Sequence, residues 1–457
     1  MSSFSKCVHF GFQFRAQGRR EAFALEIDAG VIHVDLGADV VRGLAAATGI
    51  EAGLVHSDCV GAHRGVGAVI VDPYDILAPV ARLSSLDALR GLIMIVMALD
   101  HTREFFHDGA MSFSPEDLSK TTPLLFFTRW ITHICAPVFM FTAGAAAFLW
   151  LARGHTKGQL SSFLWKRGLW LALLEITALR FAISFDLFSG PIILSVLWAL
   201  GLSMIVLAPL IHLPIRVLTV ISLATIILHN FADAWRPQSV LWNVLHRLAA
   251  FPLGGLTVIT AYPLIPWFAV MALGFCFGTI LKNEPAVRQR ITLRLGLATT
   301  AAFVALRLLN LYGDPSPWTT GLLSFLRTSK YPPSLLYLLM TLGPALLLLS
   351  YLDRRERTLP NPFIVFGRVP LFFFLLHFYV LHLLTYPFAL VKYGQAAFTL
   401  QASPAMGGNA AAFPAAYGYD LLTVYAIWVG VVVGLYPVCL WFARYKERNR
   451  GWWLSYL

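Results

Sequence analysis

The sequence contains few charged residues for its length. Asp, Glu, Lys and Arg make up only 13% of its 457 residues, whereas hydrophobic residues make up 58%. A soluble protein of this size needs more charge on its surface, so the composition excludes a soluble globular domain. Apolar runs of about 20 residues recur instead, each long enough to cross a bilayer core. Because these runs are continuous and do not alternate with polar residues, we predict an all-α, polytopic membrane helix bundle rather than a β-barrel.

The sequence also lacks the spacings that metal sites and disulfides require. Its five cysteines, at positions 7, 59, 135, 276 and 439, show no paired spacing, so we predict neither a disulfide framework nor a zinc site. The membrane segments hold no pair of histidines four residues apart, which is the spacing of a zincin-type site. We therefore predict that the protein uses no metal.

The basic residues follow a pattern that sets the topology. With the start of the first span in the cytoplasm, the connections on that side hold most of the Lys and Arg residues outside the spans. This is the positive-inside bias, which predicts that both termini are cytoplasmic. The net charge of +11 then reflects topology, and we predict no nucleic-acid partner. We expect ten spans, at residues 86–106, 124–151, 162–182, 191–211, 216–231, 257–281, 292–312, 332–351, 362–388 and 419–442.

Residues 1–80 contain no run that could span a membrane, no signal peptide and no cleavage-site pattern. We expect a poorly ordered cytoplasmic extension, or a start codon placed too far upstream, in preference to a functional domain. The membrane domain is predicted to cover residues 82–457. No internal repeat is evident, so the sequence gives no support to an inverted-repeat transporter.

The first predicted span places ionisable groups at both of its ends. It reads SSLDALRGLIMIVMALDH. On a helix of about 100° per residue, Asp87, Arg90 and His101 fall on one stripe, with His101 about 16 Å deeper than Arg90. Asp87 could simply start the helix, Arg90 could extend to the interface, and Asp100 and His101 could end the span. The alternative is that all four face the bundle interior, where ionisable groups usually mark a pathway or a reaction site.

Other spans carry isolated polar residues. Arg129 and His133 are four residues apart, so we expect them on one helix face, where both could be structural. Glu175 lies in the middle of the third span, and we expect it to pair with a cation from another helix. In the ninth span, His377 follows Arg368 by nine residues and is predicted to lie on roughly the same face.

The run SLDALRG, followed by His101 at the far end of the helix, resembles the opening signature of the membrane acyltransferase superfamily. Further runs resemble bacterial proteins of the heparan-α-glucosaminide N-acetyltransferase-like family, and the resemblance covers about residues 82–457. These runs are DLSKTTPLLFFTRWITHICAPVFMFTAG, AYPLIPWFAVMALGFCFG, KYPPSLLYLLMTLGP, GRVPLFFFLLHFYVLH and RNRGWWLSYL.

The resemblance implies a membrane enzyme that takes acetyl from cytoplasmic acetyl-CoA and passes it to a sugar amine across the membrane, using a histidine on the non-cytoplasmic side. In the lysosomal members this histidine lies in the first external loop. The corresponding run here, MSFSPEDLSKTTPLL, has none. His101 matches the position in the wider superfamily, so we assign the catalytic role to His101 rather than to His107.

These expectations give each candidate residue a role. His101 would be the general base, with Asp100 or Glu104 orienting its ring and Arg129 stabilising the oxyanion. An acetyl-histidine intermediate is the alternative route. His133 and His377 are expected to contact the acceptor. The residues expected to bind acetyl-CoA are Asp87, Arg90, Lys166, Arg167 and Arg368.

The expected location is the bacterial inner membrane, with the lipid bilayer and a sugar or glycan acceptor as partners and a homo-oligomer as one option. The sequence leaves open whether an amide or an ester is formed. Two other functions remain as alternatives. One is a proton-coupled transporter, because such proteins also carry Asp, Glu, His and Arg within the membrane. The other is a non-catalytic scaffold of an envelope or polysaccharide-export complex.

Overall fold

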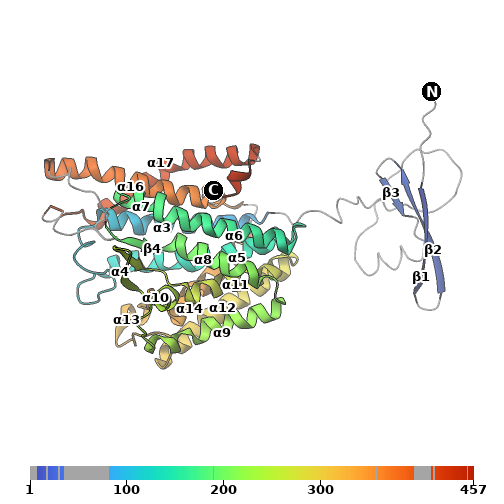
Figure 1. Cartoon of the computed structure of the whole chain (residues 1–457), viewed down its shortest axis with the longest axis horizontal. Coiled ribbons are helices and arrows are strands. Elements are labelled where there is room, and N and C mark those ends of the chain that lie inside the picture. Colours follow the sequence, from blue (N-terminus) through green and yellow to red (C-terminus); the bar gives the residue numbers. More distant parts are fainter. Residues whose placement is uncertain are drawn as a thin grey trace. The chain divides into compact units, whose positions relative to one another are not determined.

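The computed structural model describes residues 8–16, 19–28, 31–34, 82–188, 190–355, 358–395, 413–414, 417–449 and 451–456 (Figure 1). The chain divides into two compact units, Met1–Ala81 and Arg82–Leu457. In the first unit, strands β1 (Val8–Ala16), β2 (Arg19–Asp28) and β3 (Val31–Val34) form an antiparallel sheet in the order β1-β2-β3. The rest of the predicted extension lies outside the described residues.

The second unit is built from helices, and each of the ten predicted spans contains at least one of them. Seven helical stretches among the described residues are long and apolar enough to cross a membrane. The number of crossings and the side that the termini face remain predictions. The helices that correspond to the predicted spans are α3 (Ser84–Phe106), α4 (Pro123–Ile131), η1 (Thr132–Ile134), α5 (Cys135–Leu151), α6 (Lys157–Leu174), η2 (Glu175–Leu179), α7 (Arg180–Ser184), α8 (Val196–Leu210), α9 (Ile215–Leu228), η3 (His229–Ala234), α11 (Leu264–Leu281), α12 (Pro285–Leu309), α14 (Leu335–Arg354), α15 (Asn361–Arg368), α16 (Pro370–Tyr393) and α17 (Leu421–Arg448). The described residues also form the short helices α10 (Val240–His246), α13 (Gly321–Leu326) and η7 (Trp452–Ser455).

Helix α3 packs against helices from distant parts of the chain, including α5, α14, α15, α16 and α17. The contact with α15 is a close backbone approach. A Cβ on Gly91 would lie 1.7 Å from the carbonyl oxygen of Phe363, and one on Gly367 would lie 1.8 Å from that of Asp87. Glycine at both positions therefore lets the two helices touch. In Figure 1, the long helices of this unit lie roughly side by side, with α16 and α17 along one edge.

A small sheet interrupts two of the predicted spans. Strands β4 (Ile192–Leu194), β5 (Ala249–Leu253) and β6 (Leu256–Thr260) form a sheet in the order β4-β6-β5. Gly254 and Gly255 link β5 to β6 with φ angles of 57° and 84°, values that a two-residue hairpin turn favours and glycine adopts readily. The predictions that helices start at residues 191 and 257 were therefore wrong, because β4 begins at Ile192 and residue 257 lies in β6.

The ninth predicted span is two helices. Helix α15 ends at Arg368, and α16 begins at Pro370. Val369 between them has φ −128° and ψ 47°, because a residue before proline is driven out of the helical region. The expectation that Arg368 and His377 share one helix face was wrong, since the helix breaks between them.

Glu175 also differs from the expectation. Its carboxylate accepts hydrogen bonds from the backbone N–H groups of Ser195 at 2.9 Å and Trp198 at 3.0 Å. These groups lie at the amino end of α8, where unpaired N–H groups and the helix dipole favour a negative charge. Glu175 thus pairs with a helix end and not with the cation that the sequence led us to expect.

Candidate active site

Two histidines from different helices meet in the bundle. Nδ1 of His101, on α3, lies 2.7 Å from Nε2 of His377, on α16. Nδ1 of His377 lies 3.0 Å from the carbonyl oxygen of Phe373, which can only accept a hydrogen bond. With neutral rings, His377 therefore donates from Nδ1 and accepts at Nε2 from the N–H of His101. This chain of hydrogen bonds leaves Nε2 of His101 with its lone pair, which is the state that a general base needs.

The carboxylates expected to orient His101 bind arginines instead. Asp100 accepts from Nη2 of Arg103 at 3.1 Å and also forms an ion pair with Nη1 of Arg129. Glu104 lies 3.6 Å from Nη2 of Arg103. The prediction that Asp100 or Glu104 orients His101 is therefore corrected: His377 makes that contact.

Arg129 and His133 share a partner in the loop after α3. Nε of Arg129 lies 3.3 Å from Oε1 of Glu116, and Nε2 of His133 lies 2.8 Å from the same oxygen. Burial would raise the pKa of Glu116, but the hydrogen bond from His133 and the charges of His133 and Arg129 outweigh it and lower the pKa to about 2. Both side chains lie on one face, as predicted, and both are held within an ion-pair network.

A narrow cavity of about 40 Å³ adjoins His101. This volume has room for about three water molecules. Neither Arg129, Glu104 nor His133 is among the residues that line it. The polar residues that do line it are Asp100, His101, Thr132, Cys135, Tyr262 and Lys330. The sequence analysis did not identify Lys330, which lies in a connection between helices, just before Tyr331-Pro332-Pro333.

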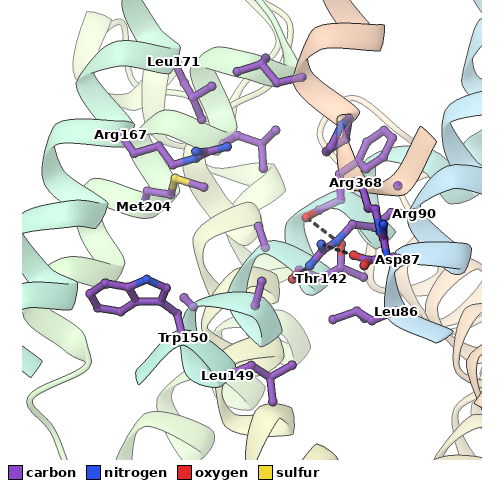
Figure 2. Close-up of a pocket in the computed structure, with 18 of the residues that line it drawn as sticks. Leu86, Asp87, Arg90, Thr142, Leu149, Trp150, Arg167, Leu171, Met204 and Arg368 are labelled. Carbon is purple, nitrogen blue, oxygen red and sulfur yellow. Dashed lines mark hydrogen bonds and ion pairs between the residues drawn. The ribbon is translucent and has the colours of Figure 1, made fainter. Parts of the chain in front are cut away.

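A wider cavity, of about 450 Å³, lies at the other end of α3 and is strongly basic. In Figure 2, Asp87 and Arg90 lie on one side of it and Arg167 on the other. Asp87 accepts from Nε of Arg82 at 2.5 Å and Nη1 of Arg90 at 3.5 Å, while Nη2 of Arg90 donates to the carbonyl oxygen of Thr142 at 3.0 Å. Among the described residues that line it, Asp87 is the only carboxylate. The cations that line the cavity are Arg82, Arg90, Arg153, Arg167, Arg368 and Lys446.

The structure separates the predicted donor-binding residues into two groups. Asp87, Arg90, Arg167 and Arg368 line the wider cavity. Lys166 does not, because it is one position away from Arg167 on α6 and its side chain is exposed.

The two cavities share a wall. Phe139, Val196 and Phe374 line both of them. The basic cavity and the cavity at His101 are thus consecutive spaces along α3, as the stripe of Asp87, Arg90 and His101 led us to expect.

Comparison with known protein families identifies a relationship for the helical unit. Residues 82–316, just over half of the chain, match the sequence model of the family described as Heparan-alpha-glucosaminide N-acetyltransferase, catalytic. The match includes His101 and most of the basic cavity, whereas Lys330 and His377 lie beyond it. No curated protein sequence matches the chain. The chain therefore belongs to the heparan-alpha-glucosaminide N-acetyltransferase family of membrane acyltransferases.

Proposed function

We propose that the protein transfers an acetyl group from cytoplasmic acetyl-CoA to an amine or hydroxyl of a sugar or glycan on the other side of a bacterial inner membrane. The observation that carries the proposal is the pair of adjoining cavities. One is wide and basic, and the next is narrow and bordered by His101. This order fits a donor with a phosphate-rich head and a small acyl group at the end of a thin arm.

The wide cavity offers the charge that the donor head requires. Six cations and one carboxylate line it, and the phosphates of coenzyme A are anionic. Arginine forks bind phosphate oxygens in pairs, which suits Arg90 and Arg167 on opposite sides. Further along, Met94, Phe139 and Phe374 line the cavity with apolar surface, against which the uncharged pantetheine arm would pack.

His101 supplies the proton chemistry. Its Nε2 lone pair would accept the proton of the acceptor amine or hydroxyl as the acceptor attacks the thioester carbonyl carbon. His377 would hold the ring in this tautomer through the 2.7 Å contact, so we move His377 from the acceptor-binding role to an orienting role. The route through an acetyl-histidine uses the same lone pair as a nucleophile.

The neighbours Lys166 and Arg167 allow a matched test of donor binding. Arg167→Met removes a cation from the cavity wall, whereas Lys166→Met removes one that faces outward. We expect Arg167→Met to raise the Kd for acetyl-CoA about tenfold or more, because a charged hydrogen bond contributes about 1.5–3 kcal/mol. Isothermal calorimetry in detergent measures both variants beside the wild type.

The Lys166→Met variant should bind acetyl-CoA as the wild type does. A donor without the 3′-phosphate of coenzyme A tests whether Arg167 binds that phosphate. If it does, the wild type should bind acetyl-CoA more tightly than the shortened donor, and Arg167→Met should show a smaller difference between the two Kd values. Equal affinities for the wild type and both variants would contradict the placement of the donor in the basic cavity.

A further inference from the structure

Lys330 places a positive charge at the narrow cavity, and the contacts of its ammonium group set it apart from the neighbouring cations. Lys330 is only 7% exposed, and it lines the cavity together with His101. Its Nζ lies 5.2 Å from the centroid of the Tyr331 ring. Among the residues that the structure describes, none forms an ion pair or a hydrogen bond with this ammonium group. Asp100 lines the same cavity but, among the described residues, forms its ion pairs with two arginines. Burying an ammonium group that has no ion pair of its own is costly, which favours a role for it with a ligand.

The other cations near His101 are already paired. Arg103 and Arg129 both bind Asp100, and Arg129 also binds Glu116. Arg129 is therefore held by carboxylates and does not line the narrow cavity, so the oxyanion role that the sequence suggested for it does not fit this geometry. Lys330 is the cation that lines the cavity itself.

The loop that carries Lys330 is held in place by buried polar groups. Asp314 accepts hydrogen bonds from the backbone N–H of Ser329 at 2.8 Å and from the hydroxyl of Ser334 at 2.6 Å, which lie on either side of Lys330. Arg307 donates to the carbonyl oxygens of Phe325 at 2.9 Å and Ser324 at 3.0 Å. The backbone that carries Lys330 is thus held before any ligand arrives, which limits where its ammonium group can lie, as an electrostatic catalyst requires.

The size of the cavity indicates which part of a ligand it holds. A space for about three water molecules accommodates a two-carbon acyl group but not a sugar ring. We propose that Lys330 Nζ stabilises the negative charge that forms on the acyl carbonyl oxygen during transfer. This inference rests on the proposed function and assigns a catalytic residue to it.

The step balances as follows. The acceptor heteroatom forms a bond to the thioester carbon, the C=O π pair moves to the oxygen beside Lys330, and the acceptor proton passes to Nε2 of His101. When the C=O bond re-forms, the C–S bond breaks. The sulfur leaves as coenzyme A thiolate and takes up the proton from His101.

The test compares Lys330→Met with the wild type in a thiol-release assay with acetyl-CoA and glucosamine, alongside calorimetric Kd values for acetyl-CoA. We expect kcat to fall about 10²–10³-fold, with the Kd for acetyl-CoA unchanged. A merely structural role would change the unfolding temperature and the Kd as well. Lys330→Gln, which keeps an N–H donor, should lose less activity than Lys330→Met, and it replaces that variant if the latter does not fold.

The outcomes separate the inference from the function on which it rests. If the wild type releases thiol and the folded variants keep its kcat, the role of Lys330 is overturned and the acyltransferase remains. If the wild type neither binds nor consumes acetyl-CoA, both proposals are overturned.

Discussion

Replacing His101 with alanine should lower the turnover of acetyl-CoA about 10²–10⁴-fold, the usual contribution of a general base. The reason is geometric. His377 fixes the tautomer of His101 so that Nε2 carries the lone pair, and the ring of His101 borders the narrow cavity. The Kd for the donor should change little, because its charged head is expected to bind in the basic cavity. Thiol release and calorimetry on the same preparation measure both quantities.

His107→Ala is the matched control for this prediction. His107 follows α3 directly, and its Nδ1 accepts the backbone N–H of Gly109 at 3.0 Å. The side chain stabilises a turn and does not line the narrow cavity. We expect a small loss of stability and a kcat close to that of the wild type. A His101→Ala variant that turns over as fast as His107→Ala would show that His101 is not the base.

The largest loss of stability should come from Arg129→Met. Arg129 pairs with Asp100 and Glu116, and the side chains of Arg129 and Asp100 are both less than a tenth exposed. Without Arg129, Asp100 keeps only the weaker contact with Arg103, at 3.1 Å, and Glu116 loses its arginine. Breaking a buried ion pair typically costs about 3–5 kcal/mol. Thermal unfolding in detergent should therefore show a clearly lower midpoint for Arg129→Met, together with a loss of activity.

Lys166→Met provides the control for this stability prediction, because it removes an equal charge from an exposed position. Surface ion pairs contribute little, so its unfolding midpoint should match that of the wild type. If Arg129→Met had the same unfolding midpoint as Lys166→Met, the ion-pair network around Asp100 would not stabilise the protein.

The helical frame could be predicted because its signals are local. Apolar runs of span length located the long helices, and the helical repeat placed Asp87, Arg90 and His101 on one stripe that lines the two cavities. The hairpin of β5 and β6 was missed, although Gly254-Gly255 between two β-branched or apolar runs is a local hairpin signal. The apolarity of the segment outweighed it in our interpretation.

The partners within the site could not be predicted, because they depend on contacts between distant segments. His101 and His377 are 276 positions apart, and no local pattern indicates that their rings meet. Asp100 was expected to serve His101 because the two are adjacent in sequence. Adjacent residues on a helix point about 100° apart, however, and Asp100 meets Arg129 instead.

A role for Lys330 was even less evident from the sequence than the contact between His101 and His377. It lies in a connection between helices, where a lysine is normally solvated, and only the fold brings it beside His101. A buried lysine in such a loop becomes recognisable once Asp314 and Arg307 are seen to hold the surrounding backbone.

Transfer of acetyl across a sealed bilayer tests the central claim most directly. The protein is reconstituted into vesicles with glucosamine inside, and acetyl-CoA labelled in the acetyl group is added outside. The account predicts labelled acetyl-glucosamine inside the vesicles that contain the wild type and almost none with His101→Ala. The account would be contradicted if folded protein in sealed vesicles left the acetyl-CoA outside unchanged and gave no labelled product inside.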